Sequence, residues 1–275
     1  MSQPVSSTLR AAVYIIGAGP GDPELLTVKA AKIISQADVI VFANSLVPKQ
    51  ILHHVRPEAE LIPTGNKTLE EIIPLMVERV KAGLSVVRLH SGDLTLYSAI
   101  TEQMQALAAE KIPFELIPGI SAFQAAAAKL STELTIPEVV QTIILTRISG
   151  RASGVPETEE LASLAAHQAS LCLYLAARHV EVAQEKLLQH YPPETPVAIC
   201  FRVGWSDEKI WLVPLEQMSA VTQRENLVRT TLYLISPALK FLEQKENTTV
   251  TRSQLYHPQH SHLFRPVPHE TQKMS

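Results

Sequence analysis

Three short glycine-containing segments of the sequence have compositions suited to binding a small molecule. The first runs from Gly17 to Pro23 and reads Gly-Ala-Gly-Pro-Gly-Asp-Pro, between a β-branched run and a helix-like stretch. Glycines let the backbone turn tightly and approach a ligand closely, and a helix start offers free N–H groups. A dinucleotide fingerprint requires glycine where Asp22 stands, and a Walker loop requires a following Gly-Lys-Ser/Thr. We therefore predict a ligand-binding loop that belongs to neither class.

The second and third segments each combine glycine with one polar side chain. Arg88 to Asp93 reads Arg-Leu-His-Ser-Gly-Asp, and its aspartate could accept hydrogen bonds from a cationic or hydroxylated ligand, or cap the next helix. Pro118 to Ala122 reads Pro-Gly-Ile-Ser-Ala. Its small residues leave room for a flat ligand, and Ser121 could bond that ligand or cap a helix. Taken singly, neither segment decides between these roles.

The elements that position these segments alternate between strand-like and helix-like stretches. A Thr-Leu-Glu-Glu capping box starting at Thr68 marks one helix start. The alternation predicts a parallel sheet covered on both faces, and the carboxyl ends of its strands share one edge, where the three segments converge on a crevice. The predicted strands are 13–16, 39–42, 61–63, 86–89 and 114–117, and the predicted helices are 24–35, 68–83 and 96–109.

The pattern starts again after the third segment with different spacing. The predicted helices are 122–129, 157–167 and 180–190, and the predicted strands are 142–146, 171–175, 197–201, 210–213 and 231–235. We therefore expect two α/β domains, 11–118 with a parallel sheet and 119–239 with a mixed sheet. Residues 240–275 are polar, contain four histidines and are expected to be a disordered tail rather than a metal site. No other Cys, His, Asp and Glu cluster has metal-ligand spacing.

Composition narrows the function classes. The chain has 275 residues, of which 46% are hydrophobic and 19% charged, which is typical of a globular protein. A net charge of −3 and 5% aromatic residues disfavour nucleic acid as a partner. No apolar run is long enough to span a membrane. Cys172 and Cys200 lie in apolar runs and are predicted to be buried free thiols, so we expect a cytoplasmic, reducing location.

In this order and at these intervals, the three segments resemble the tetrapyrrole methylases, the S-adenosylmethionine-dependent enzymes of corrin and sirohaem synthesis. The resemblance covers Val13 to Ser236. Further segments are similar to the subgroup that methylates C-11 of precorrin-4 or cobalt-precorrin-4. These are Val87 to Asp93, Pro118 to Phe123, Glu133 to Thr142, Thr146-Arg147, Gly150 to Ser153, Val155 to Glu157 and Arg202 to Ile210.

The resemblance implies that the cofactor lies in the cleft between the two domains. It also implies that Asp93 holds the ribose or the amino group. Two departures from the family pattern, Leu94 in place of proline and Leu175 in place of methionine, are expected to alter packing and retain binding. The implied cofactor-binding residues are Pro20, Gly92, Asp93, Leu96, Ser121, Ala122, Leu175, Val203 and Thr231.

The implied reaction is methyl transfer to a ring carbon, with S-adenosylhomocysteine as the second product. Such a reaction depends mainly on positioning, and no catalytic base is named. Arginines suit an acid-rich tetrapyrrole substrate, although any one of them could instead form a surface ion pair. The candidate substrate-binding residues are Asp22, Asn44, Ser45, Arg88, Tyr97, Glu138, Arg147 and Arg151.

The resemblance implies a homodimer in cobalamin biosynthesis. A sister methylase acting on another ring carbon and a non-catalytic cofactor-binding protein remain as alternatives. A methylase of RNA or of a translation factor is disfavoured by the acidic charge and the low aromatic content.

Overall fold

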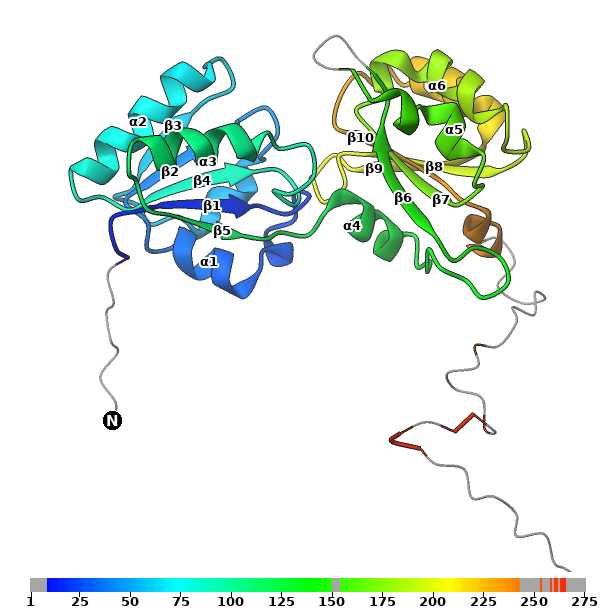
Figure 1. Cartoon of the computed structure of the whole chain (residues 1–275), viewed down its shortest axis with the longest axis horizontal. Helices are drawn as coiled ribbons and strands as arrows, with labels where there is room; N and C mark the ends of the chain where they lie inside the picture. The colour runs from blue at the N-terminus through cyan, green and yellow to red at the C-terminus, as the bar shows by residue number, and fades with distance from the viewer. Residues whose placement is uncertain are drawn as a thin grey trace, which may run out of the picture.

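A computed structural model describes residues 9–149 and 154–242, with a few positions between 253 and 265. Figure 1 shows two lobes side by side, each built on one β-sheet. The segment that leads from β5 (Phe114–Ile117) into α4 (Ala122–Lys129) joins them. The predicted α/β class with two sheets is confirmed.

The first sheet is parallel throughout and has the strand order β3-β2-β4-β1-β5. Alternate residues of β1 pack on opposite faces: Tyr14 and Ile16 lie against α1 (Val28–Ile34), and Val13 and Ile15 lie on the face of α2 (Leu69–Lys81) and α3 (Ile100–Ala109). Both faces are therefore covered, as predicted for a parallel sheet. The remaining strands are β1 (Val13–Gly17), β2 (Val39–Phe42), β3 (Glu60–Pro63) and β4 (Val86–His90).

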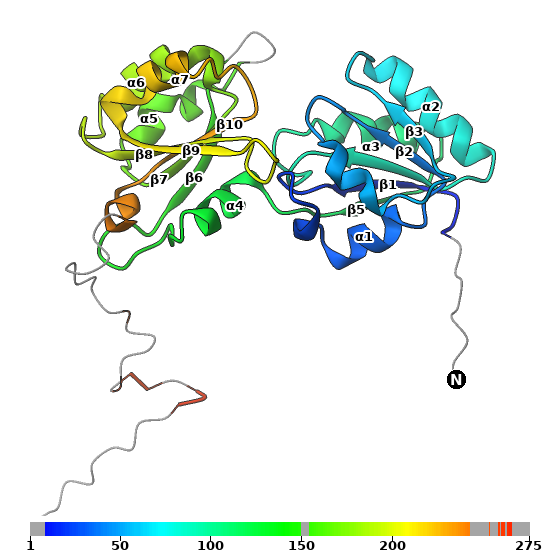
Figure 2. The same ribbon diagram turned by 180° about the vertical axis from the view of Figure 1, so that it is seen from behind.

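The second sheet is mixed, with the order β6-β7-β10-β8-β9. Only β6 and β7 pair in parallel, and the other pairings are antiparallel. Figure 2 shows α5, α6 and α7 along one side of this sheet and α4 on the other. The bounds are β6 (Ile143–Arg147), α5 (Leu161–Ala165), β7 (Ser170–Tyr174), α6 (Val180–Leu187), β8 (Pro196–Phe201), β9 (Lys209–Pro214), α7 (Met218–Arg224) and β10 (Thr231–Ile235).

The predicted domain limits stay predictions, with one adjustment at the tail. A 3-10 helix, Pro237–Leu242, continues past residue 239, and Leu239 and Leu242 pack against the α4 side of the second sheet. This 3-10 helix therefore reaches three residues into the predicted tail. Most of that tail lies outside the described residues.

Several helix predictions need correction, whereas the strands lie where expected. The predicted helix 24–35 is a 3-10 turn (Pro23–Leu25) followed by α1, because the Thr27 hydroxyl accepts a hydrogen bond from the Ala30 N–H at 3.2 Å and starts a new helix. The predicted helix 157–167 divides at Glu160, whose carboxylate accepts from the Ala162 N–H at 3.0 Å.

Four other helices also differ from expectation. The helix expected at 96–109 starts only at Ile100, because Tyr97 and Ala99 adopt left-handed φ angles of 55° and 48°. Helix α6 ends at Leu187, three residues before the expected end. The helix α7 and the 3-10 helix Lys49–His54 were not predicted.

The strand order places a switch point between β1 and β4. The chain leaves β1 toward β2 on one side and leaves β4 toward β5 on the other, so the loops after β1 and β4 part and open a crevice. These two loops pair through their backbones: Gly92 N–H donates to Gly19 O at 2.7 Å, and Gly19 N–H donates to Gly92 O at 3.1 Å.

The exit of β5 packs directly onto these two loops. A Cβ placed on Gly119 would lie 2.5 Å from the Gly17 carbonyl oxygen and closer still to that of Gly92. Real Cβ atoms essentially never approach backbone this closely, so only glycine fits. Three strand exits are thus held backbone to backbone.

We predict that Gly119→Ala lowers the free energy of unfolding by about 3 kcal/mol, because its neighbours are backbone atoms that cannot yield easily. Urea denaturation measures this. The matched control is Gly154→Ala, where a Cβ meets no atom within 4 Å and the change should stay within about 0.5 kcal/mol. Equal stability of the two variants would show that the strand exits tolerate separation.

Candidate functional site

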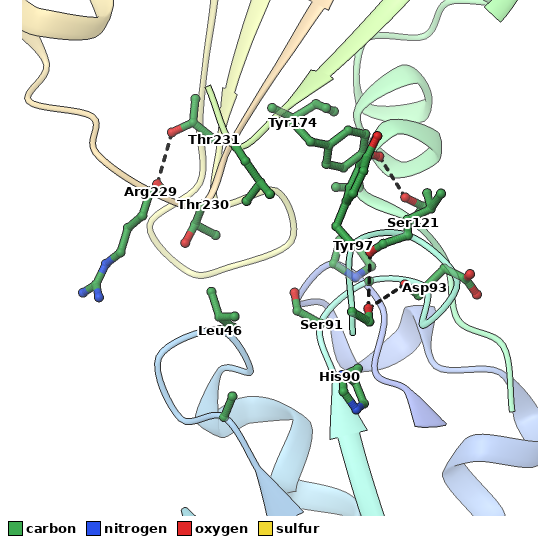
Figure 3. A pocket seen from close by; sticks show the side chains of 18 of the residues that line it. Leu46, His90, Ser91, Asp93, Tyr97, Ser121, Tyr174, Arg229, Thr230 and Thr231 are labelled. Atoms are coloured by element: carbon green, nitrogen blue, oxygen red, sulfur yellow. Dashed lines mark hydrogen bonds between the residues drawn. The ribbon is translucent and has the colours of Figure 1, made fainter. Parts of the chain in front are cut away.

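A cavity of about 680 Å³ lies between the two lobes at the switch point of the first sheet. Residues of the first lobe come from the end of β4, from α3 and from the loops after β1, β2 and β4. Residues of the second lobe come from β7, β8, β10 and the loops beside them. Figure 3 shows side chains of both lobes facing this space. Its volume is typical of a small-molecule site.

All nine sequence-predicted cofactor residues line this one cavity. The first lobe supplies four of them, the start of α4 two and the second lobe three. The structure therefore brings the predicted set together, and the role of each member stays a prediction. They are Pro20, Gly92, Asp93, Leu96, Ser121, Ala122, Leu175, Val203 and Thr231.

Asp93 connects two of the strand exits through its carboxylate. One oxygen accepts from the Gly119 N–H at 2.9 Å, and the other accepts from the Thr95 N–H at 2.9 Å and from the Thr95 hydroxyl. Burial acts to raise the pKa of Asp93, but the hydrogen bonds from Thr95 and Gly119 outweigh it and hold this pKa below its usual value. The carboxylate is therefore ionised at neutral pH, and it does not cap α3.

An aromatic pair links the two lobes inside the cavity. The rings of Tyr97 and Tyr174 lie 5.4 Å apart at an angle of 51°. The Tyr174 hydroxyl is 2.9 Å from the Ser121 hydroxyl at the start of α4 (Figure 3). The faces of such rings attract cations, which suits a ligand that carries a sulfonium.

Four residues that line the cavity have left-handed backbone conformations without being glycine. They are Tyr97, Ala99, Leu175 and Thr230, with φ between 48° and 55°. Each such residue costs about 1 to 3 kcal/mol, so the surrounding fold must stabilise it. The Leu175 side chain is 65% exposed, which is unusual for leucine and presents an apolar surface at the cavity.

The floor of the cavity holds a buried positive charge. Arg88 is only 7% exposed, and its guanidinium donates to the Thr64 hydroxyl at 2.9 Å and to Gln103 Oε1 at 3.4 Å. No carboxylate of the described residues pairs with it. Burial lowers the pKa of Arg88 to about 10, so the group stays charged at neutral pH.

His90 lies beside Arg88 on the cavity floor. Burial, together with the positive charge of Arg88, lowers the pKa of His90 to about 4. Its Nε2 atom is buried and has no hydrogen-bond partner among the described residues. The imidazole is therefore neutral at physiological pH.

Of the eight predicted substrate residues, the structure brings only Arg88 and Tyr97 to the cavity. Asp22 and Asn44 accept hydrogen bonds from the Glu24 and Gly65 N–H groups, at 2.9 and 3.0 Å, and so support local turns. The other described candidates, Ser45, Glu138 and Arg147, do not line it either, and Arg147 donates to the Gly154 carbonyl at 3.0 Å. Arg151 lies outside the described residues.

Several cavity residues were missed by the sequence analysis. Arg178, His179 and Arg229 contribute positive or titratable groups from the second lobe, and Cys200 contributes a thiol. The basic residues follow β7 or precede β10, and this position beside a strand end was the available signal. Burial raises the pKa of Cys200 to about 12, so this thiol is protonated, and both cysteines are buried and free as predicted.

A second connection between the lobes lies beside the cavity. Gln50 donates to the Gly21 carbonyl at 2.6 Å and to the Gly204 carbonyl at 2.8 Å. The Trp205 indole N–H donates to the Pro20 carbonyl at 3.2 Å. The glycine-rich loop after β1, Gly17 to Pro23, is thereby attached to the segment 202–210, which is similar to the precorrin-4 subgroup.

The sequence matches the family described as Tetrapyrrole (Corrin/Porphyrin) Methylases over residues 12–219. The chain belongs to this family. It is 43% identical over 228 residues to a cobalt-precorrin-4 C(11)-methyltransferase of Methanocaldococcus jannaschii, covering 82% of this chain and 88% of that one. It is 41% identical over 254 residues to a precorrin-4 C(11)-methyltransferase of Pseudomonas aeruginosa, covering 92% and 98%.

Solved structures agree with this membership. A cobalt precorrin-4 methyltransferase matches with a TM-score of 0.80 and 38% identity, covering 83% of this chain and 96% of that one. A uroporphyrin-III C-methyltransferase from Thermus thermophilus, complexed with S-adenosylhomocysteine, matches with a TM-score of 0.68 and 25% identity, covering 84% and 94%. The tetrapyrrole methylase predicted from sequence is confirmed, and with it an S-adenosylmethionine-dependent C-methyltransferase.

This tetrapyrrole methylase contains no helix, within its described residues, of the length and apolar character that crossing a bilayer requires.

The buried imidazole predicts a specific pH dependence. Because the pKa of His90 is lowered in the folded protein, the unfolded chain binds an extra proton as the pH falls from about 6.5 to about 4, and stability is lost across that window. We expect His90→Gln to reduce the slope of unfolding free energy against pH there by up to about 1.4 kcal/mol per pH unit. Chemical denaturation at several pH values tests this, and parallel profiles would contradict a neutral buried His90.

Proposed function

We propose that this tetrapyrrole methylase transfers a methyl group from S-adenosylmethionine to C-11 of precorrin-4 or cobalt-precorrin-4, in corrin synthesis. The observation that carries the proposal is the single cavity between the lobes, which is lined by all nine predicted cofactor residues. Two relatives and the solved cobalt precorrin-4 methyltransferase support this choice of methyl acceptor, since their names give precorrin-4 or its cobalt form. We include both forms because the names divide between them.

The residues present fit the cofactor that the family uses. The strand exits and the α4 start present small residues, Gly92, Ser121 and Ala122, which leave room for a flat base. Tyr97 and Tyr174 offer ring faces near which a sulfonium is favourable. Asp93 is ionised and fixes the loop after β4, so it acts on the cofactor from a rigid position. When bound, the cofactor supplies an electrophilic methyl group.

The chain's own part in the reaction is positioning. The four left-handed residues present preformed surface at the cavity, so little order has to be gained when the reactants bind. The apolar side chains of Leu46, Leu175 and Val228 line the cavity and reduce the access of water to the reacting atoms. An electron-rich macrocycle provides the carbon nucleophile, so we assign no general base.

We propose Arg88 and Tyr97 as substrate contacts among the original candidates. Arg88 is a buried guanidinium without a carboxylate partner. The free-energy cost of removing it from water arises on folding, so an incoming anion gains the attraction without adding that cost. Tyr97 offers an aromatic face to the macrocycle. A homodimer and a cytoplasmic location also belong to this proposal, with family resemblance supporting the first and the two buried free thiols supporting the second.

Two measurements test the proposed function. Isothermal titration with S-adenosylhomocysteine should show about one site per chain with micromolar affinity. Incubation with precorrin-4, in metal-free and cobalt forms, and with methyl-labelled S-adenosylmethionine should give a product whose NMR spectrum places the label at C-11. Absence of cofactor binding would remove the enzyme assignment. A label at another carbon would indicate a sister specificity.

We expect Asp93→Ala to weaken S-adenosylhomocysteine binding more than tenfold. The reason is that a charge-assisted hydrogen bond contributes about 1.5 to 3 kcal/mol and the variant also frees Gly119. Titration calorimetry measures the affinity. Glu110→Ala is the control, since it removes an exposed carboxylate that pairs with Lys81 outside the cavity. Unchanged affinity in Asp93→Ala would refute the cofactor site.

A further inference from the structure

The charge of the cavity is opposite to the charge of the chain. The chain carries 24 Lys and Arg against 27 Asp and Glu, for a net charge of −3. Three arginines line the cavity, whereas Asp93 is the only acid among the described residues that line it. The Asp93 carboxylate is already bonded to Gly119 and Thr95. The cavity therefore offers uncompensated positive charge to a ligand.

Two of these arginines, Arg178 and Arg229, lie on the second lobe, and we call them the arginine rim. Arg178 belongs to the 3-10 turn Ala177–His179 after β7, and Arg229 lies two residues before β10. Both side chains are exposed and line the cavity, and Figure 3 shows the Arg229 side chain extending away from the other labelled residues.

Neither rim arginine pairs with an acid in the described parts of the chain. Arg56, Arg79, Arg202 and Arg224, in contrast, each have an acidic partner. An arginine that is held beside a cavity without a counter-charge is suited to bind an anionic group of a ligand, because guanidinium and carboxylate match in geometry.

The open space continues beyond the main cavity on the side of the rim. A second cavity of about 440 Å³ adjoins it, and the two share Ala177, Arg178, His179 and Val228. Arg178 therefore stands where the two spaces meet. Under the proposed function the site must accept two molecules, a cofactor and a macrocycle, so the larger one has to extend beyond the cofactor cavity.

We infer that the arginine rim binds the carboxylate side chains at the periphery of the tetrapyrrole substrate and thereby orients the macrocycle over the cofactor. This inference rests on the proposed function. The cofactor is the other available carboxylate source, but its single carboxylate is balanced by its own ammonium group. The periphery of an acid-rich tetrapyrrole carries several carboxylates without such compensation, and these match two separated arginines.

The first test separates substrate from cofactor. Arg178→Gln and Arg229→Gln should each raise the KM for precorrin-4 about fivefold, as expected for a partly exposed ion pair, and the double variant should raise it by roughly the product. The Kd for S-adenosylhomocysteine, which retains the cofactor carboxylate, should change less than about twofold. Arg224→Gln, which removes an arginine paired with Glu225 outside the cavity, is the control and should leave both constants unchanged.

Two results would overturn the inference. One is an unchanged KM in the double variant, and the other is a loss of S-adenosylhomocysteine affinity that parallels the rise in KM. Because both rim arginines are exposed and unpaired, the variants should fold, and equal melting temperatures check this.

A second test does not depend on catalysis. Uroporphyrin III and coproporphyrin III share a macrocycle, but uroporphyrin carries more carboxylates. The wild type should bind uroporphyrin more tightly by absorbance titration, and the double variant should lose most of that preference. No preference in the wild type, or a preference that survives the double substitution, would overturn the rim assignment. If preference is lost as expected but no C-11 product forms, the rim stands and the proposed function alone fails.

Discussion

The close packing of three strand exits determines where everything else in this site can lie. A Cβ on Gly17 or on Gly119 would clash with the backbone of the other two loops, and the Asp93 carboxylate joins the exits of β4 and β5. Because β1, β4 and β5 end together, the loops that follow them are brought to one edge, where the connections from β1 and β4 leave toward opposite sides of the sheet. The helix α4, which leads into the second lobe, starts at Ala122, only a few residues beyond Gly119. The packing of Gly119 on Gly17 therefore limits how far the second lobe can lie from the loop after β1. The hydrogen bonds of Gln50 and Trp205 then attach the loop after β1 to the second lobe.

The sequence allowed the strands to be predicted well, and it identified nine residues that line one cavity. Buried parallel strands appear as short β-branched runs, such as Val39–Phe42, and glycine-rich exits mark their ends. The helix starts were less predictable, because a single side chain such as Thr27 or Glu160 decides them. The late start of α3 could not be predicted at all, since the left-handed Tyr97 and Ala99 are maintained by tertiary packing and have no local signature.

Most of the candidate substrate residues do not line this cavity, for a related reason. Polar residues near a strand exit either face the cavity or stabilise the adjacent turn, and the sequence pattern is the same in both cases. Asp22 and Asn44 accept hydrogen bonds from backbone N–H groups of nearby loops, whereas Arg88 lines the cavity while it donates to the Thr64 hydroxyl. Arg178 and Arg229 were overlooked because they lie outside the motifs, yet they give an acidic chain a basic cavity. The positions of charged residues in the folded structure thus identified cavity-lining arginines that the sequence motifs did not include.

The burial of Cys200 affects whether its thiol could be alkylated by a methyl donor in the cavity. A thiolate is a better nucleophile toward a sulfonium methyl group than a ring carbon, so a reactive cysteine beside the donor would be alkylated by it. Cys200 lines the cavity, but burial raises its pKa to about 12, and Cys172 is buried in the same core. The sulfur therefore remains a protonated, unreactive thiol. With the methyl donor in its proposed position, the protonated Cys200 thiol would not compete with the ring carbon for the methyl group.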